Sequence, residues 1–306
     1  MSAEERIQEW IERGDETVVL DLSHLMNIGK LPKLPPNLQI LNCSYCDKLK
    51  EIPELPANLQ ELYCSGCPIE QIPKLPESLQ ILNCNMCYSL KELPELPANL
   101  QKLDCCSCYK LKEFINLPIN LQELKCSNCP NLKELPKLPP NLQILNCFNC
   151  CNLKELSELP SSIKKLYCYK CIIKELPELP LNLQVLDCSH CLIKELPKLP
   201  PNLQKIDCSS CSIKELPELP LNLQVLDCSH CLIKELPKLP PNLQKIYCSS
   251  CSIKELPELP VNLQTLYCFI CPIEKLPELP PSLQNLNCVK CPIEILPTIL
   301  PKEIYL

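Results

Sequence analysis

The sequence contains very little glycine, few aromatic residues and no long apolar segment. Only three glycines occur among its 306 residues, and aromatic side chains make up 4%. This scarcity of glycine argues against a glycine-rich phosphate loop or a dinucleotide-binding turn, and no G-x-S-x-G nucleophile motif is found. No apolar run approaches the roughly 18–20 residues that a membrane-spanning helix needs. The sequence therefore favours neither a nucleotide-dependent enzyme, nor a hydrolase of that type, nor a membrane protein.

Two further absences concern partners and compartment. The net charge is −6 with Lys and Glu interleaved, so no basic stripe is available to follow a nucleic acid. Residues 1–5 are acidic and lack the basic and apolar regions of a secretory signal. Without a signal, the 28 cysteines are expected to be thiols in a reducing cytoplasm rather than the disulfide framework of an exported protein.

What the sequence has in abundance is a repeated Cys-x-x-Cys pair. The pair occurs thirteen times, from Cys43/Cys46 to Cys288/Cys291, at intervals of 20 or 21 residues. Self-similarity at a fixed period of this length is typical of a repeat solenoid, in which each repeat buries its core only against its neighbours. We predict one mostly-β solenoid domain over residues 17–306, with about 14–15 coils stacked as short parallel strands into a curved rod.

Each repeat predicts a short strand followed by an extended back. In 183–188 the alternation places Leu183, Leu186 and Cys188 inward, and Val185 and Asp187 outward onto the concave face. The Leu-Pro-x-Leu-Pro segment that follows favours a polyproline-like conformation, because proline fixes φ and restricts the residue before it. The convex side is therefore expected to be extended rather than helical.

Residues 1–16 are expected to form a helix that covers the open end of the first coil. Ser2 and Glu5 have the spacing of a capping box, and Gly14 is suited to a left-handed helix stop. Ile7, Trp10 and Ile11 share one helix face. The remainder of the sequence contains a copied block, since residues 177–216 and 217–256 are identical except at Asp207 and Tyr247.

The Leu-Pro-x-Leu-Pro-x-x-Leu-x-x-Leu pattern resembles the LPX class of leucine-rich repeats in secreted bacterial effectors of the YopM and IpaH kind. The Cys-x-x-Cys-x-x-Leu form at 126–132 is similar to repeats of giant-virus and amoeba-associated proteins. The resemblance covers about residues 17–306 and implies a non-catalytic, protein-binding solenoid. Two departures are that Cys stands where those repeats carry a ladder Asn, and that no C-terminal domain follows like the one holding the catalytic cysteine of ubiquitin-ligase effectors.

The cysteines allow two interpretations. Both members of each pair are expected to face inward as small hydrophobes, with the second S–H replacing the hydrogen bond of a ladder Asn. Alternatively, stacked pairs such as Cys188, Cys191, Cys208 and Cys211 would offer four thiolates to zinc, Cu(I) or an iron–sulfur cluster. We favour packing and no cofactor, because thirteen pairs do not divide evenly into two-coil sites. Cys106 breaks the pattern and is expected to be a reactive surface thiol.

The concave face carries the remaining functional information. Exposed aromatic side chains on a rigid sheet are enriched at protein interfaces, although strands also favour tyrosine for other reasons. We predict a non-enzymatic scaffold, acting in a cytoplasm (that of a host if the source is a pathogen or virus), that binds a protein with a basic element and an apolar anchor. The expected binding residues are Tyr167, Tyr169, Asp187, Asp207, Asp227, Tyr247, Tyr267 and Phe269.

The C-terminal residues suggest one more contact. Residues 301–306 fall within what would be the next strand, and no capping helix follows them. An uncovered strand edge is a site of association. We therefore expect self-association through the C-terminal end, or a covering segment beyond it.

Overall fold

The structure is a computed structural model and describes residues 1–294 and 303–305. The chain divides into two compact units, Met1–Leu153 and Lys154–Leu306, and each is described by itself. Within the described residues, unit 1 contains α1 (Ala3–Arg13), β1 (Leu20–Asp21), β2 (Ile40–Asn42), β3 (Glu61–Tyr63), β4 (Ile81–Asn83), β5 (Lys102–Asp104), β6 (Glu123–Lys125) and β7 (Ile144–Asn146). Unit 2 contains β8 (Lys165–Tyr167), β9 (Val185–Asp187), β10 (Lys205–Asp207), β11 (Val225–Asp227), β12 (Lys245–Tyr247), β13 (Thr265–Tyr267), β14 (Asn285–Asn287) and β15 (Glu303–Tyr305).

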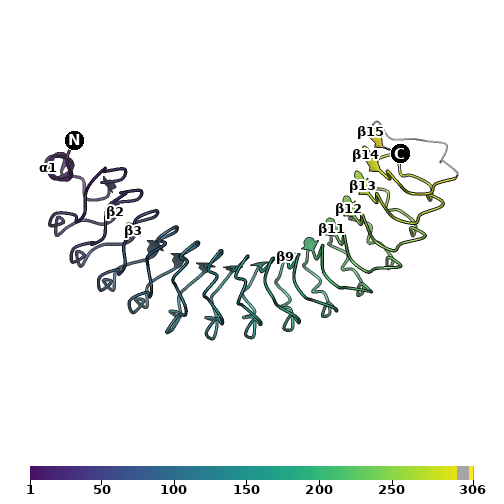
Figure 1. Cartoon of the computed structure of the whole chain (residues 1–306), viewed down its shortest axis with the longest axis horizontal. Coiled ribbons are helices and arrows are strands. Elements are labelled where there is room, and N and C mark those ends of the chain that lie inside the picture. Colours follow the sequence, from purple (N-terminus) through teal and green to yellow (C-terminus); the bar gives the residue numbers. More distant parts are fainter. Residues whose placement is uncertain (295–302, 306) are drawn as a thin grey trace. The chain divides into compact units, whose positions relative to one another are not determined.

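Each unit is a stack of parallel strands in sequence order (Figure 1). Equivalent residues of successive coils are in register, as Leu186 is with Ile206 and Ile206 is with Leu226. The described backs of the coils contain no helix. The predicted solenoid with strands on one side and an extended back is therefore confirmed. That residues 17–306 act as one domain stays a prediction.

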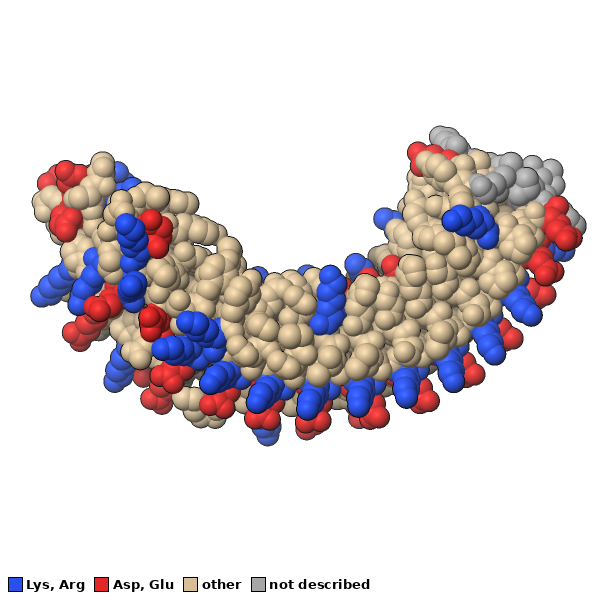
Figure 2. All heavy atoms as spheres, viewed as in Figure 1, with Lys and Arg blue, Asp and Glu red and all other residues tan. Residues whose placement is uncertain are grey.

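The core lies between the strands and the back of each coil. Leu183, Leu186 and Cys188 are completely buried, while Val185 and Asp187 are only half-buried, as the alternation predicted. On the side away from the strands, Lys and Glu side chains gather in rows in each unit (Figure 2). The strand face differs from this side in carrying aromatic residues and aspartates, such as Tyr247 and Asp227, together with lysines such as Lys205.

Helix α1 begins and ends as predicted. The Ser2 hydroxyl accepts the Glu5 N–H at 3.2 Å, and the Glu5 carboxylate accepts the Ser2 N–H at 2.7 Å. Gly14 is left-handed, with φ of 70°. The Trp10 indole N–H donates to the carbonyl of Val18 at 2.8 Å, which ties the helix to the segment that leads into β1. Of the three apolar residues on the shared helix face, Ile7 and Trp10 are buried, whereas Ile11 is 50% exposed.

Arg6 has a capping role that the sequence did not reveal. Its Nη1 donates to the carbonyls of Asp21 and Ser23, at 3.1 and 3.0 Å. In this fold the N–H groups of one coil donate to carbonyls of the next, as Leu22 does to Asn42. The first coil has no preceding coil to donate to its own carbonyls, so the Arg6 guanidinium supplies donors at that edge.

An asparagine ladder runs along the edge where the chain enters each strand, and it was not predicted. Asn202 donates its side-chain N–H to the carbonyl of Leu181 in the preceding coil at 3.0 Å. Ser78 and Ser282 make equivalent bonds. This interaction satisfies backbone carbonyls that would otherwise lack donors. The asparagines with such a bond are Asn99, Asn120, Asn141, Asn182, Asn202, Asn222, Asn242 and Asn262.

The C-terminal end adds β15, which pairs with β14 in parallel. Residues 295–302 and 306 lie outside the described part of the chain, so the predicted self-association through this end stays a prediction. No helix in the described part is both long and apolar enough to cross a membrane.

Candidate functional site

One outward position of the strands β8 to β13 in unit 2 forms a continuous row on the strand face. Its members are the last residues of β8 to β13, and each is in register with the next. All are half-buried, and successive members are about 4.8 Å apart along the row. We call this row the Asp–Tyr column, and it consists of Tyr167, Asp187, Asp207, Asp227, Tyr247 and Tyr267.

The two ends of the Asp–Tyr column are aromatic. The rings of Tyr247 and Tyr267 meet edge to face, with centroids 5.4 Å apart and an interplanar angle of 89°. Tyr169 and Phe269 lie in the turns that follow β8 and β13, and both are half-buried. Burial and the charge of Asp187 raise the pKa of Tyr169. The structure therefore brings all eight residues singled out from the sequence onto one face of one unit.

The aspartates of this column also close the turn after each strand. Oδ1 of Asp207 accepts the backbone N–H of Ser209 at 3.1 Å and its hydroxyl at 2.7 Å. Asp187 accepts the corresponding N–H and hydroxyl of Ser189 at 3.2 and 2.8 Å. A side chain that accepts the N–H two residues later forms an Asx turn. Asparagine in the same column does so in unit 1, where Asn42 accepts the Ser44 N–H at 3.1 Å.

The environment of these carboxylates opposes their charge. Burial raises the pKa of Asp187 above its ordinary value, and the neighbouring Asp207 raises it further, while the Ser189 hydrogen bonds lower it. Burial likewise raises the pKa of Asp227, with Asp207 adding to the effect. Like charges stacked at the spacing of adjacent strands repel one another. A cationic group bound at this face would reduce the repulsion between the carboxylates and would offset the cost of their partial desolvation.

Ser249 shows what the exchange of Asp for Tyr does to the copied block. Its side chain is 1% exposed, and its hydroxyl is the one buried side-chain N or O atom in the described residues without a hydrogen-bond partner. At the equivalent position in the first block, Ser209 donates to Asp207. Tyr247 replaces that carboxylate, so Ser249 has lost its acceptor. The block therefore carries Tyr247 at the cost of an unsatisfied buried hydroxyl.

The cysteine pairs form a hydrogen-bonded ladder in the core. Sγ of Cys211 donates to the carbonyl of Cys188 in the preceding coil at 3.3 Å. The second cysteine of the pair thus donates its S–H to the backbone of the neighbouring coil in place of a ladder Asn, as the packing interpretation predicted. The equivalent sulfur-to-carbonyl bond is made by Cys46, Cys67, Cys87, Cys108, Cys129, Cys150, Cys191, Cys231, Cys251, Cys271 and Cys291.

The geometry gives the metal hypothesis no support. Cys188, Cys191, Cys208 and Cys211 are all buried. Interaction with the Cys211 thiol and burial raise the pKa of Cys188 well above its ordinary value, whereas the same interaction lowers the pKa of Cys211. The two thiols therefore influence each other as a pair and are not both favoured as thiolates. Across the described residues, no group of three or more His, Cys, Asp or Glu is placed to hold a metal ion. The described cysteines form no disulfide.

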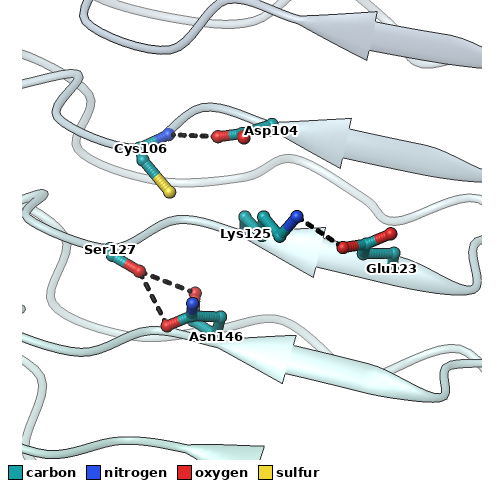
Figure 3. A network of polar contacts seen from close by, with 6 residues as sticks. All are labelled: Asp104, Cys106, Glu123, Lys125, Ser127 and Asn146. Atoms are coloured by element: carbon teal, nitrogen blue, oxygen red, sulfur yellow. Dashed lines mark hydrogen bonds and ion pairs between the residues drawn. The ribbon is translucent and has the colours of Figure 1, made fainter.

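Two expectations about individual thiols were wrong. Cys106 was expected to point to solvent, but it is half-buried beside Asp104 (Figure 3). Burial and the Asp104 carboxylate raise the pKa of Cys106 to about 12, so it is not a reactive surface thiol; the exposed one is Cys151. Cys291 was expected to be buried like the other pair members and is half-exposed.

The same part of unit 1 shows how differently its strand face is used. In β6, Lys125 occupies the position that aspartate or tyrosine holds in unit 2, and its Nζ lies 2.6 Å from the Glu123 carboxylate (Figure 3). Ser127 donates to the side chain of Asn146 at 2.8 Å. Lys125 is therefore paired with Glu123 and Ser127 with Asn146, so the outward charge of β6 is compensated within its own strand.

Comparison with known proteins agrees with the repeat and the fold. The family described as Leucine Rich Repeat matches residues 58–79, and no curated protein sequence matches the chain. The chain is similar to YopM, a leucine-rich effector protein from Yersinia pestis, with 29% identity and a TM-score of 0.82 over 99% of this chain and 92% of YopM. It is similar in fold to CroV588, a circular LRR protein, with 21% identity and a TM-score of 0.57 over 89% of this chain and 44% of CroV588.

Proposed function

Because the chain is a leucine-rich-repeat protein that resembles YopM, we propose that it is a non-catalytic scaffold that binds another protein through the strand face of unit 2. The Asp–Tyr column, with Tyr169 and Phe269 beside it, is the proposed contact surface. Tyrosine and phenylalanine on a sheet backbone bury much area while losing little side-chain entropy. The aspartates would contribute long-range attraction and orientation toward a basic partner.

The observation that carries the proposal is the single difference between the two copied blocks. Asp207 and Tyr247 occupy equivalent positions in otherwise identical 40-residue segments, and the tyrosine leaves Ser249 without its hydrogen-bond partner. Places where a sequence departs from its own local rule at a cost in stability are expected to be functional. The difference lies on the strand face, where Tyr247 ends the row of aspartates and forms a pair of rings with Tyr267.

We propose a reducing cytoplasm as the place of action, that of a host cell if the protein is delivered there. The described cysteines are thiols, and the core depends on their S–H groups as donors to backbone carbonyls. Oxidising conditions would remove those donors. YopM, to which the chain is similar, is an effector protein, and this supports an effector-like role.

The test uses a partner identified by affinity capture and then purified. Two double variants separate the two kinds of contact: Asp187→Asn with Asp227→Asn, and Tyr247→Ala with Tyr267→Ala. The first pair should slow association and weaken its dependence on salt, because charge acts mainly on the encounter. The second pair should mainly raise the dissociation rate, because buried aromatic contacts hold a complex together.

Matched controls come from the same chain. Asparagine already closes the turn in this column at Asn42, so the Asp→Asn changes should leave the fold intact. The alanine variants are compared with Lys198→Ala and Glu218→Ala, which change exposed side chains on the back of the coils. Unchanged kinetics in both strand-face variants, with a loss in the back variants, would move the binding surface away from the Asp–Tyr column.

A further inference from the structure

The junction between the acidic and aromatic parts of the Asp–Tyr column places a carboxylate next to a pair of rings. Asp227 is in register with Tyr247, and Tyr247 is in register with Tyr267. The edge-to-face arrangement of the two rings, at 89°, puts two ring planes at right angles beside the carboxylate. Burial raises the pKa of Tyr247, and Tyr267 and Asp227 raise it further. The three side chains therefore act as one local group.

Asp227 lacks a strong counter-charge within the protein. Asp227 forms no ion pair with a described residue. The outward residue at the start of its own strand is Val225, whereas β10 and β12 carry Lys205 and Lys245 at that position. The charge of His230 offsets part of the effect of burial on the pKa of this carboxylate. A half-buried carboxylate in this setting favours binding an external cation.

A second observation at the same place is the buried, unpartnered hydroxyl of Ser249. In the first block, the equivalent Ser209 hydroxyl points at Oδ1 of Asp207. Apart from residue 247, the segment around Ser249 has the same sequence as the segment around Ser209. The turn is also the same, since Ser250 and Ser210 both have φ of 56°. In the first block the acceptor of this hydroxyl is residue 207, and the counterpart of residue 207 in the second block is Tyr247. Compared with the first block, the second block therefore has an aromatic ring at residue 247 in place of a carboxylate that accepts a hydrogen bond from serine.

We propose that Asp227, Tyr247 and Tyr267 form a receptor for an arginine side chain of the protein partner. Resting on the proposed function, this inference names the chemistry that the same face recognises. A guanidinium group is planar, stacks on aromatic rings and donates in parallel to a carboxylate. It is also more weakly hydrated than the ammonium of lysine, so it loses less when it leaves water for a half-buried site.

The test uses acetyl-arginine-amide as the probe, with acetyl-lysine-amide and acetyl-leucine-amide as comparisons. The full chain carries ring-labelled tyrosine, and the Tyr247 and Tyr267 resonances are followed by NMR. The arginine probe should shift both resonances saturably, and about three- to tenfold more tightly than the lysine probe. The leucine probe should give no saturable shift. Equal binding of the leucine probe would overturn the proposal, because the site would then be merely apolar.

The copied block supplies variants that should keep their fold. Tyr247→Asp makes residues 217–256 identical to 177–216, restores an acceptor for Ser249 and should abolish the shift at Tyr267. Tyr247→Phe should preserve the site, because stacking does not need the hydroxyl. Asp207→Tyr makes the first block identical to the second and should add a second, weaker response. A saturable arginine response that survives in Tyr247→Asp would contradict the proposal.

The outcomes separate this inference from the proposed function. If the arginine probe fails while the purified partner still depends on Tyr247 and Tyr267, the arginine receptor is wrong and the binding face stands. If binding of the partner also does not depend on Tyr247 and Tyr267, both the arginine receptor and the proposed binding face are wrong. If the probe binds as described and competes with the partner, both are supported.

Discussion

Ser209 donates its hydroxyl hydrogen to Oδ1 of Asp207 at 2.7 Å, whereas Ser249, its counterpart in the copied block, is buried without a partner. The two serines have the same neighbours in sequence except for residue 247. Comparing Ser209 with Ser249 therefore measures the effect of one hydrogen bond on stability, because the two serines lie in otherwise identical segments of the same protein.

Removing each hydroxyl should have opposite effects. Ser249→Ala should stabilise the protein by about 0.5–1.5 kcal/mol, because an unsatisfied buried hydroxyl is removed. Ser209→Ala should destabilise it by about 1 kcal/mol, because a hydrogen bond to a carboxylate is lost. Urea denaturation of the two variants measures both changes. Equal destabilisation by both would mean that Ser249 has a partner after all, such as a bound water.

The aspartates should make stability fall as pH rises from acid to neutral. The pKa values of Asp187 and Asp227 are higher in the folded chain than the ordinary 3.8. A carboxyl that holds its proton more tightly when folded contributes stability below the ordinary pKa, and this is lost as pH rises through the folded pKa. The free energy of unfolding of the Asp187→Asn, Asp227→Asn double variant should therefore increase relative to that of the native protein as pH rises to 7.

The comparison is made by urea denaturation at several pH values. The difference in unfolding free energy between variant and native protein should be smallest below pH 3.8 and should increase toward neutrality in favour of the variant. A difference that changes in the other direction would show that the folded state favours the charged carboxylates.

The cysteine ladder predicts that an inner thiol cannot be exchanged for a hydroxyl. Cys208 is completely buried, and its sulfur donates to the carbonyl of Asp227 at 3.4 Å. Cys208→Ser should cost about 1–3 kcal/mol, because the shorter hydroxyl is more polar and is poorly placed for that acceptor. Cys151→Ser, at an exposed cysteine, is the control and should change stability little. Equal and small effects would indicate that water reaches the inner column.

Gly66 predicts a steric effect on its neighbour Tyr45. Gly66 has φ of +67°, and a Cβ there would lie 2.6 Å from Cδ1 of Tyr45. Tyr45 in turn stacks on His24, with ring centroids 5.2 Å apart. Gly66→Ala should cost about 1–3 kcal/mol from the left-handed backbone and the displaced ring together. In a Tyr45→Ala background the same change should cost clearly less, which a double-mutant cycle measures. The same cost in both backgrounds would exclude the contact.

The core was predictable because its signal is local and repeated. The alternation around Leu186 and Cys188 decides which side chains are buried, and each coil repeats it. The Asn202 ladder was missed because an asparagine before a strand also suits an ordinary turn. Its signal was present, since Asn recurs at this position through the Leu-Pro-x-Asn-Leu-Gln segment of most repeats.

The eight expected binding residues were found by the same alternation, but their energetic roles were not. That Asp207 closes a turn depends on a contact with Ser209 two residues later, which the pattern of apolar residues does not report. The expectation of a reactive Cys106 failed because the side chain is half-buried beside Asp104, which the repeat pattern does not report. Both are consequences of packing between coils, and they require coordinates.

The most direct test of the account is a site-specific cross-link. A photoreactive benzoylphenylalanine replaces Tyr267 on the strand face in one variant and Glu218, which is exposed on the back of its coil, in another. The purified partner is added to each and irradiated. If the partner binds the strand face of unit 2, a cross-link forms from position 267 and none forms from position 218. Excess native protein without benzoylphenylalanine should reduce the cross-link from position 267. A cross-link from position 218 alone would contradict binding through the strand face of unit 2.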